Sequence, residues 1–142
     1  MECCIVSTLR KPVGISYNHI RNVITYVLGE EKKVGDLTVH LIGDTKMKRL
    51  QRIYRGKSKT TDVLSFAAQE GITMAPETSL GDIFLSVPHI RQQAKDWSVS
   101  FSEEFHRMLI HGLLHILGYD HVKKTDAKIM FGKQEKYLEK VV

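Results

Sequence analysis

The sequence contains little cysteine: Cys3 and Cys4 are the only two in 142 residues, and they are adjacent. Neighbouring cysteines cannot close a useful structural disulfide, and no third cysteine exists to pair with either. A disulfide-stabilised secreted scaffold is therefore excluded, and the composition fits a reducing compartment. We interpret the pair as two small apolar residues of a first strand, in preference to metal ligands.

Long hydrophobic runs are also lacking. The most apolar stretch, MLIHGLLHILG at 108–118, is too short and too rich in histidine to cross a bilayer. The N-terminal MECCIVSTLRKP has no basic segment and too short an apolar run for a signal peptide. Repeats, low-complexity tracts and a domain linker are absent as well. We expect a soluble, cytoplasmic protein with a single domain over residues 1–142 and no membrane partner.

What the sequence does contain is enough apolar material for a core. Hydrophobic residues make up 42% of the chain and charged residues 26%, as in ordinary soluble domains. Lys and Arg outnumber Asp and Glu by 21 to 16, which gives a net charge of +5 and a pI near 9.2. This excess favours a polyanionic partner such as RNA only weakly, because many basic proteins bind none.

Four segments have the alternating apolar and polar residues or the β-branched composition that are typical of strands, and segments with helical periodicity lie between them. The predicted strands cover 2–9, 36–43, 61–66 and 80–87. In the second strand Leu37, Val39 and Leu41 share one face, whereas the segment 67–79 lacks periodicity and is predicted to be a loop. Mixed strands and helices indicate an α+β (mixed α/β) fold, a small domain with one four-stranded sheet flanked by helices.

Apolar spacing and capping residues predict helices between and after these strands. The helices cover 17–28, 45–55, 88–97, 101–118 and 123–140. Asp44 would cap the second helix, Gly29 would end the first, and Pro88 opens the third. Ser100 and Glu103 form a capping-box pattern before the fourth helix. That helix is apolar nearly all round in its second half, so it should be the buried, central one.

Three of the seven histidines fall within HGLLHILGYDH at 111–121. His111 and His115 are four residues apart, which places them one turn apart on one face of a helix. Gly118 can adopt the left-handed conformation that ends a helix, so that His121 turns back toward the first two. Three imidazoles and a water make a tetrahedral site with one open position, as in catalytic zinc centres. The pattern predicts one zinc ion per chain, with nickel or another divalent ion as alternatives.

The spacing also resembles the HExxH helix of metalloproteases, in which a glutamate general base follows the first histidine. Here that position is Gly112, so a protease of that type is disfavoured. The remaining histidines are isolated from the cluster. We interpret His106 as a surface or packing residue, and His19, His40 and His89 as ordinary structural ones.

A second segment, YRGKSKTTDVLSF at 54–66, brings Arg55, Lys57 and Lys59 within five residues of one another. Arginine offers a planar fork for phosphate and lysine a mobile charge, so this basic turn is a candidate phosphate contact, although alone it is more typical of a solvated loop. The predicted helix just upstream adds Lys46, Lys48, Arg49 and Arg52. Within this region Lys57, Lys59, Arg52 and Lys48 are the candidates for binding an RNA backbone.

Three motifs together closely resemble those of the YbeY family, namely HGLLHILGYDH, YRGKSKTTDVLSF and LGDIFLS (80–86). The resemblance covers nearly the whole chain. The resemblance implies a metal-dependent endoribonuclease that prefers single strands and acts in ribosomal RNA maturation and ribosome quality control. It also implies a centrally packed metal-binding helix with His111, His115 and His121 as ligands, and Arg55 as the basic residue implicated in activity. The implied partners are ribosomal RNA, small ribosomal subunit proteins and a ribosome-associated GTPase. Thr60 departs from the family, which commonly has proline there.

Two carboxylates are candidates to support the metal ligands, since a metal-bound histidine usually gives its other N–H to a carboxylate or carbonyl. Asp120 precedes His121, and Asp82 lies in the LGDIFLS strand. The alternatives are that Asp120 caps the final helix and that Asp82 makes a local structural bond. An alternative function also stays open, namely a non-catalytic RNA- or ribosome-binding assembly factor whose metal is structural.

Overall fold

A four-stranded sheet lies at the centre of the computed structural model, which describes residues 2–57, 59–68 and 79–141. Its strands are β1 (Cys3–Ser7), β2 (Asp36–Ile42), β3 (Val63–Ala67) and β4 (Ser79–Ser86), in the order β1-β2-β4-β3. β1, β2 and β4 are parallel, and β3 runs antiparallel along β4. The predicted strands are confirmed to within two residues at their ends, while the predicted loop lies almost wholly outside the described residues.

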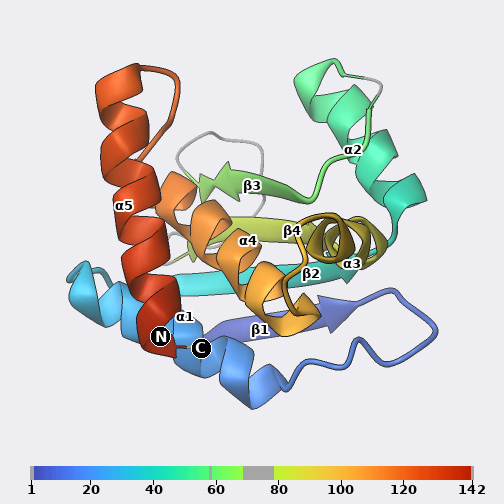
Figure 1. Cartoon of the computed structure of the whole chain (residues 1–142), viewed down its shortest axis with the longest axis horizontal. Coiled ribbons are helices and arrows are strands. Elements are labelled where there is room, and N and C mark those ends of the chain that lie inside the picture. The colour runs from blue at the N-terminus through green and yellow to red at the C-terminus, as the bar shows by residue number, and fades with distance from the viewer. Residues whose placement is uncertain (1, 58, 69–78, 142) are drawn as a thin grey trace.

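Helices cover both faces of this sheet, which confirms the predicted α+β fold. They are α1 (Tyr17–Glu30), α2 (Asp44–Arg55), α3 (Val87–Asp96), α4 (Phe101–Ile116) and α5 (Lys124–Val141). α4 crosses one face between α3 and α5, and α1 packs on the same side (Figure 1). α2 packs against the opposite face through Met47, beside Phe66 of β3. None of the helices in the described part of the chain is long and apolar enough to span a membrane.

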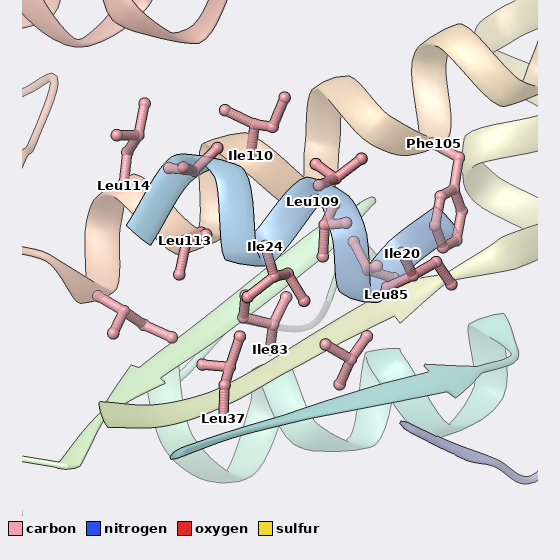
Figure 2. Close-up of a cluster of buried hydrophobic side chains, with 14 of the residues drawn as sticks. Ile20, Ile24, Leu37, Ile83, Leu85, Phe105, Leu109, Ile110, Leu113 and Leu114 are labelled. Carbon is pink, nitrogen blue, oxygen red and sulfur yellow. The ribbon is translucent and has the colours of Figure 1, made fainter. Parts of the chain in front are cut away.

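The main core lies between α4, α1 and the sheet. The alternation predicted for β2 is confirmed, because Leu37, Val39 and Leu41 are all buried on one face. Leu109 and Leu113 of α4 pack down onto this layer (Figure 2). Each such aliphatic side chain contributes roughly 1.5–3 kcal/mol when fully buried. α4 is therefore the central, buried helix that its apolar composition predicts, and it is a rigid support for the side chains on its remaining face.

The close approach of α4 to the sheet depends on Gly112. A Cβ atom at this position would lie 3.0 Å from Cγ2 of Val63 in β3 and 3.1 Å from Cγ2 of Ile83 in β4. Both distances are tighter than ordinary van der Waals contact, so the absence of a side chain lets the helix sit directly on the two strands. The residue after the first histidine of the cluster thus faces the sheet, and it has a packing role.

The prediction that Gly29 ends the first helix is wrong. α1 continues to Glu30, and Lys32 adopts the left-handed conformation (φ 54°) just beyond its end. A left-handed conformation costs a residue other than glycine roughly 1–2 kcal/mol, and the neighbouring residue makes tertiary contacts that hold this turn. The Glu31 carboxylate, for example, accepts a hydrogen bond from the Tyr119 hydroxyl at 2.6 Å. The local sequence therefore placed the end of the helix too early, before Gly29 instead of after Glu30.

Asp44 is the first helical residue of α2 and not its cap, which is Gly43 without a side-chain hydrogen bond. The Asp44 carboxylate instead accepts hydrogen bonds from Ser86 Oγ (2.6 Å) and Thr60 Oγ1 (3.2 Å). It thereby ties the start of α2 to the end of β4 and to the segment that follows α2. Thr60 supplies one of these tethers.

The predicted capping box of α4 is only half formed. Ser100 caps the helix, because its Oγ accepts the backbone N–H of Glu103 at 3.0 Å. The Glu103 carboxylate does not complete the box and instead pairs with Arg107 one turn further along, at 3.2 Å. Pro88 lies in the first turn of α3, one residue after the helix begins at Val87, so the predicted start is late by one residue.

Candidate metal centre

Three histidines converge at the C-terminal end of α4. His111 and His115 lie one turn apart on the helix, with ring centroids 4.9 Å apart, and His121 joins them from the following segment at 5.4 and 5.0 Å. One ring nitrogen from each lies within 4.8 Å of the others, close enough for a single metal ion. The clustering predicted from the spacing is therefore present in the fold.

The turn at Gly118 brings His121 back to the helix. Gly118 adopts a positive φ of 105°, and its N–H donates to the carbonyl of His115 at 3.0 Å. The N–H of Tyr119 donates to the carbonyl of Leu114, also at 3.0 Å. This pair of bonds is the Schellman pattern, in which a left-handed residue reverses the chain just past the helix. The predicted role of Gly118 is confirmed.

Asp120 does not cap the last helix, because α5 begins only at Lys124. Its carboxylate accepts the backbone N–H of Val122 at 3.2 Å, which shapes the short segment that carries His121. The charge of Asp120 still acts on the cluster, where it opposes the fall in the pKa of His115. Asp120 therefore stays a candidate support for the site, through its charge.

One of the histidines has a hydrogen-bond partner outside the cluster. Nδ1 of His111 lies 2.7 Å from Oε1 of Gln134, a buried residue of α5. The backbone of Tyr119 acts on the pKa of His115, where it opposes the lowering by burial. Sequence reasoning missed Gln134, because it lies 23 residues away and reaches His111 only through the packing of α5 on α4. No local signal in the sequence marks it.

The donor set fits a divalent metal ion, because a histidine must be neutral to bind one. Burial lowers the pKa of His111, although its hydrogen bond to Gln134 works in the other direction. Burial lowers the pKa of His115 as well, and the neighbouring rings of His111 and His121 lower it further. Two of the three imidazoles are thus held in the state that a metal requires at neutral pH.

A further aromatic ring covers part of the cluster. Phe131 of α5 stacks against both His111 and His121, with interplanar angles of 22° and 23° and centroid distances of 6.0 and 5.7 Å. Its side chain is still 43% exposed, so one part of the ring is open to solvent beside the site. Sequence reasoning missed this residue too.

The histidines open into a cavity of about 420 Å³ between α4 and the segment that joins α2 to β3. Arg55 and Lys57 line this cavity from the end of α2 and the turn after it. Arg55 Nη2 donates to the carbonyl of Ser65 at 3.0 Å, and its guanidinium lies 4.8 Å from the ring centroid of Phe66. Gly56 is left-handed (φ 66°), which ends α2 and turns the chain along the cavity wall.

Asp62 lines the same cavity and was not identified from the sequence. Its carboxylate accepts hydrogen bonds from the backbone N–H of Val63 (2.9 Å), from Thr61 Oγ1 (3.1 Å) and from Gln93 Nε2 (3.1 Å). Its charge acts on His111, where it favours the protonated form. Asp62 therefore places a hydrogen-bonded carboxylate in the cavity that the histidines also line.

The other basic candidates lie outside the cavity wall. Lys48 and Arg52 are exposed on α2, and Lys59 is exposed after it. They add positive charge on and just after α2, outside the residues that line the cavity.

The hypothesis that Asp82 supports the metal ligands is corrected by the structure. Asp82 Oδ1 is hydrogen-bonded to His40 Nε2 at 2.9 Å, and His40 stacks on Phe84 with centroids 4.1 Å apart. Alternate residues of a strand point to opposite faces, and Ile83 points toward α4. Asp82 consequently lies on the other face of the sheet, and the local structural alternative is the one observed.

The buried histidines predict an acid-sensitive fold. His106 is fully buried, its Nδ1 donates to the carbonyl of Ser102 at 2.7 Å, and its Nε2 has no partner among the described residues. Burial lowers the pKa of His106, as it does for His111 and His115. The unfolded chain therefore binds more protons than the folded one below about pH 6.5, so stability is full above that pH and falls as the pH decreases.

We expect the urea concentration at which half of the metal-free protein is unfolded to decrease as the pH is lowered from about 6.5 to 5. This interval lies above the pH at which ordinary carboxylates titrate. A His106→Gln variant should show a shallower pH dependence over the same interval. An unchanged midpoint across this interval would contradict the prediction.

Known proteins provide independent comparisons for this fold and site. The family model described as Endoribonuclease YbeY matches residues 9–142. A curated Endoribonuclease YbeY from Fusobacterium nucleatum is 39% identical over 127 residues, covering 85% of this chain and 78% of that protein. One from Staphylococcus carnosus is 38% identical over 131 residues, covering 87% and 84%. A solution structure from Thermotoga maritima matches with a TM-score of 0.69 at 26% identity, covering 98% of this chain and 88% of that one.

A central helix that carries two of three clustered histidines above a mixed sheet defines an α+β protein with a potential metal centre. The chain belongs to the YbeY family. The resemblance seen in the sequence motifs is confirmed.

Proposed function

We propose that this protein is a metal-dependent endoribonuclease that prefers single-stranded RNA and acts in ribosomal RNA maturation and ribosome quality control. The observation that carries the proposal is that His111, His115, His121 and Arg55 line one cavity. A potential metal site and a phosphate-binding side chain at one surface are the parts that phosphodiester cleavage needs. The name of the matching relatives, endoribonuclease, supports the same activity.

The metal would be held by the three histidines, one ion per chain. Nitrogen ligands suit zinc, and nickel is the main alternative. When bound, such an ion supplies Lewis acidity and positive charge at the phosphodiester. Three protein ligands leave a coordination position open, which is typical of catalytic and not of closed structural zinc sites.

Arg55 would stabilise the negative charge that develops on the phosphate oxygens. Its contacts with Ser65 and Phe66 hold the guanidinium at the cavity wall, so little side-chain entropy is lost when it binds. The terminal groups of the RNA products show whether a water or a 2′-hydroxyl attacks phosphorus. A 2′,3′-cyclic phosphate would identify the 2′-hydroxyl as the nucleophile.

The exposed basic residues beyond the cavity would bind flanking phosphates. Lys57 lines the cavity, and Lys59, Arg52 and Lys48 are exposed outside it. Each phosphate contact releases counterions, so RNA affinity should fall steeply with salt. Asp120 would act at the other side of the site by favouring positive charge near His115.

The wider biological setting belongs to the same proposal. Ribosomal RNA would be the substrate, with small ribosomal subunit proteins and a ribosome-associated GTPase as partners, and the cytoplasm as the location. The sparse, adjacent cysteines fit that compartment. We further propose that residues 1–142 act as one domain, since one core joins helices from both ends of the chain.

An Arg55→Ala variant tests the proposed chemistry. We expect cleavage of a single-stranded ribosomal RNA fragment to slow about 100- to 1,000-fold, as when one charge-stabilising donor is removed from an active site. Arg55→Lys should recover part of this loss, because it restores charge without the planar fork. The rate is measured with saturating RNA, so that weaker binding is separated from slower chemistry.

Arg49→Ala is the matched control, since Arg49 is an exposed arginine of the same helix outside the cavity. It should cleave at nearly the wild-type rate. Equal rates for Arg55→Ala and the wild type would exclude Arg55 from the reaction. If the zinc-loaded wild type binds RNA but does not cleave it, the proposed nuclease is wrong, and the assembly factor with a structural metal is favoured instead.

A further inference from the structure

Gln134 occupies an unusual position for a glutamine, buried against a potential metal ligand. It is only 5% exposed, and its Oε1 lies 2.7 Å from Nδ1 of His111. In a buried amide both the oxygen and the nitrogen need a hydrogen-bond partner, and the two orientations of the amide fill the same space. The partner of the other end therefore decides which atom faces the histidine.

That partner is the carboxylate of Glu135, whose Oε2 accepts Gln134 Nε2 at 3.1 Å. Burial alone would raise the pKa of Glu135, but the interactions with its neighbours, first among them the hydrogen bond and charge of Arg107, outweigh it and lower the pKa. An ionised carboxylate can only accept hydrogen bonds. The amide nitrogen must therefore point to Glu135, and the amide oxygen must point to His111.

Arg107 of α4 holds this carboxylate in place. Its Nε lies 3.1 Å from Glu135 Oε2, and its Nη2 lies 3.3 Å from Oε1. The same guanidinium also pairs with Glu104, which is buried, and with Glu103 at 3.2 Å. The carboxylate is consequently tied to the helix that carries His111, so the chain of contacts begins and ends on α4.

We propose that Gln134 is a positioning residue that fixes the tautomer of His111, an inference that rests on the proposed metal site. An amide oxygen accepts hydrogen bonds, so Nδ1 of His111 must carry the proton. Nε2 then keeps its lone pair and is the nitrogen presented to the metal. The chain Arg107–Glu135–Gln134 thus sets which nitrogen of His111 binds, from groups that do not touch the ion.

The first test is made on the metal-free wild-type protein, by long-range ¹H–¹⁵N NMR of the imidazole nitrogens at neutral pH. We expect His111 as the Nδ1–H tautomer. The Nε2–H tautomer would overturn the proposal whatever the variants do. RNA cleavage is not involved, so a failure of the proposed nuclease activity leaves this result unaffected.

The second test compares Gln134→Met with Gln134→Glu by zinc competition against a chromophoric chelator. Methionine keeps the size of the side chain and removes the acceptor, so zinc should bind about 10- to 100-fold more weakly. Glutamate restores an acceptor for Nδ1–H and should recover most of the affinity, which a purely packing role would not explain. Gln92→Met, at an exposed glutamine of α3, is the matched control and should leave zinc binding unchanged.

Melting of each metal-free variant shows whether it is folded. The proposal would be overturned if Gln134→Met bound zinc as tightly as the wild type. It would also be overturned if Gln134→Glu lost as much zinc affinity as Gln134→Met. If Gln134→Met fails to fold, the comparison of Gln134→Glu with the wild type and the wild-type tautomer still decide the question.

Discussion

A His115→Ala variant is expected to stay folded, lose its metal and cleave RNA at least about 100-fold more slowly than the wild type. Loss of a group that merely supports a ligand already costs 10- to 100-fold in metal affinity, so loss of a ligand should cost more. His115 is one of three imidazoles whose nitrogens lie within 4.8 Å, and the remaining pair would leave the ion weakly held. Metal content and cleavage are measured on the same samples.

The fold should survive because His115 contributes little to the core. Its side chain is only partly buried, and alanine is the residue most compatible with a helix interior. The apolar side chains of α4 that pack on the sheet are untouched. His89→Ala, a histidine of α3 outside the cluster, is the control and should keep both metal and activity.

Three results would change the interpretation. If His115→Ala and the wild type cut RNA equally, the activity belongs to a contaminant or to another part of the surface. If the wild type carries metal and neither protein cuts, the assembly-factor function is favoured. If the variant keeps a full equivalent of metal, the three histidines are not its ligands.

The fold and the centre of the site follow from short-range sequence patterns. The alternation in β2 identifies its buried face because a strand repeats every two residues. His111 and His115 are adjacent in space because a helix repeats every 3.6 residues. Gly118 adds the turn that returns His121, and its conformation is one that glycine adopts at little cost. Each of these inferences uses residues only a few positions apart.

The supporting groups could not be predicted because they depend on packing between distant elements. Gln134 contacts His111 from α5, and Asp62 accepts a hydrogen bond from Gln93 of α3. Asp82 shows the opposite error: its sequence neighbourhood suggested the site, but the strand alternation sends it to the other face, where it meets His40. Which face of a strand receives a particular helix is a tertiary fact that periodicity does not contain.

The second large effect is expected at Gly112, where Gly112→Glu should destabilise the protein by about 3 kcal/mol or more. The new Cβ would press on Val63 and Ile83 at 3.0 and 3.1 Å, and overpacking of this kind typically costs 1–3 kcal/mol. The carboxylate would also be buried between α4 and the strands without a partner, which adds a further desolvation penalty. Urea unfolding of the metal-free variant measures the loss.

Gly132→Glu provides the matched control, because Gly132 is an exposed helical glycine with nothing within 4 Å of its hypothetical Cβ. The same substitution there should be neutral, or stabilising by up to about 1 kcal/mol through helix propensity. Equal stability of Gly112→Glu and the wild type would mean that α4 does not sit directly on β3 and β4. The expected result has a functional consequence, since a glutamate at position 112 would face the sheet. The residue that serves as the base in an HExxH protease therefore has no room in this fold, so a protease mechanism of that type is disfavoured by packing as well as by sequence.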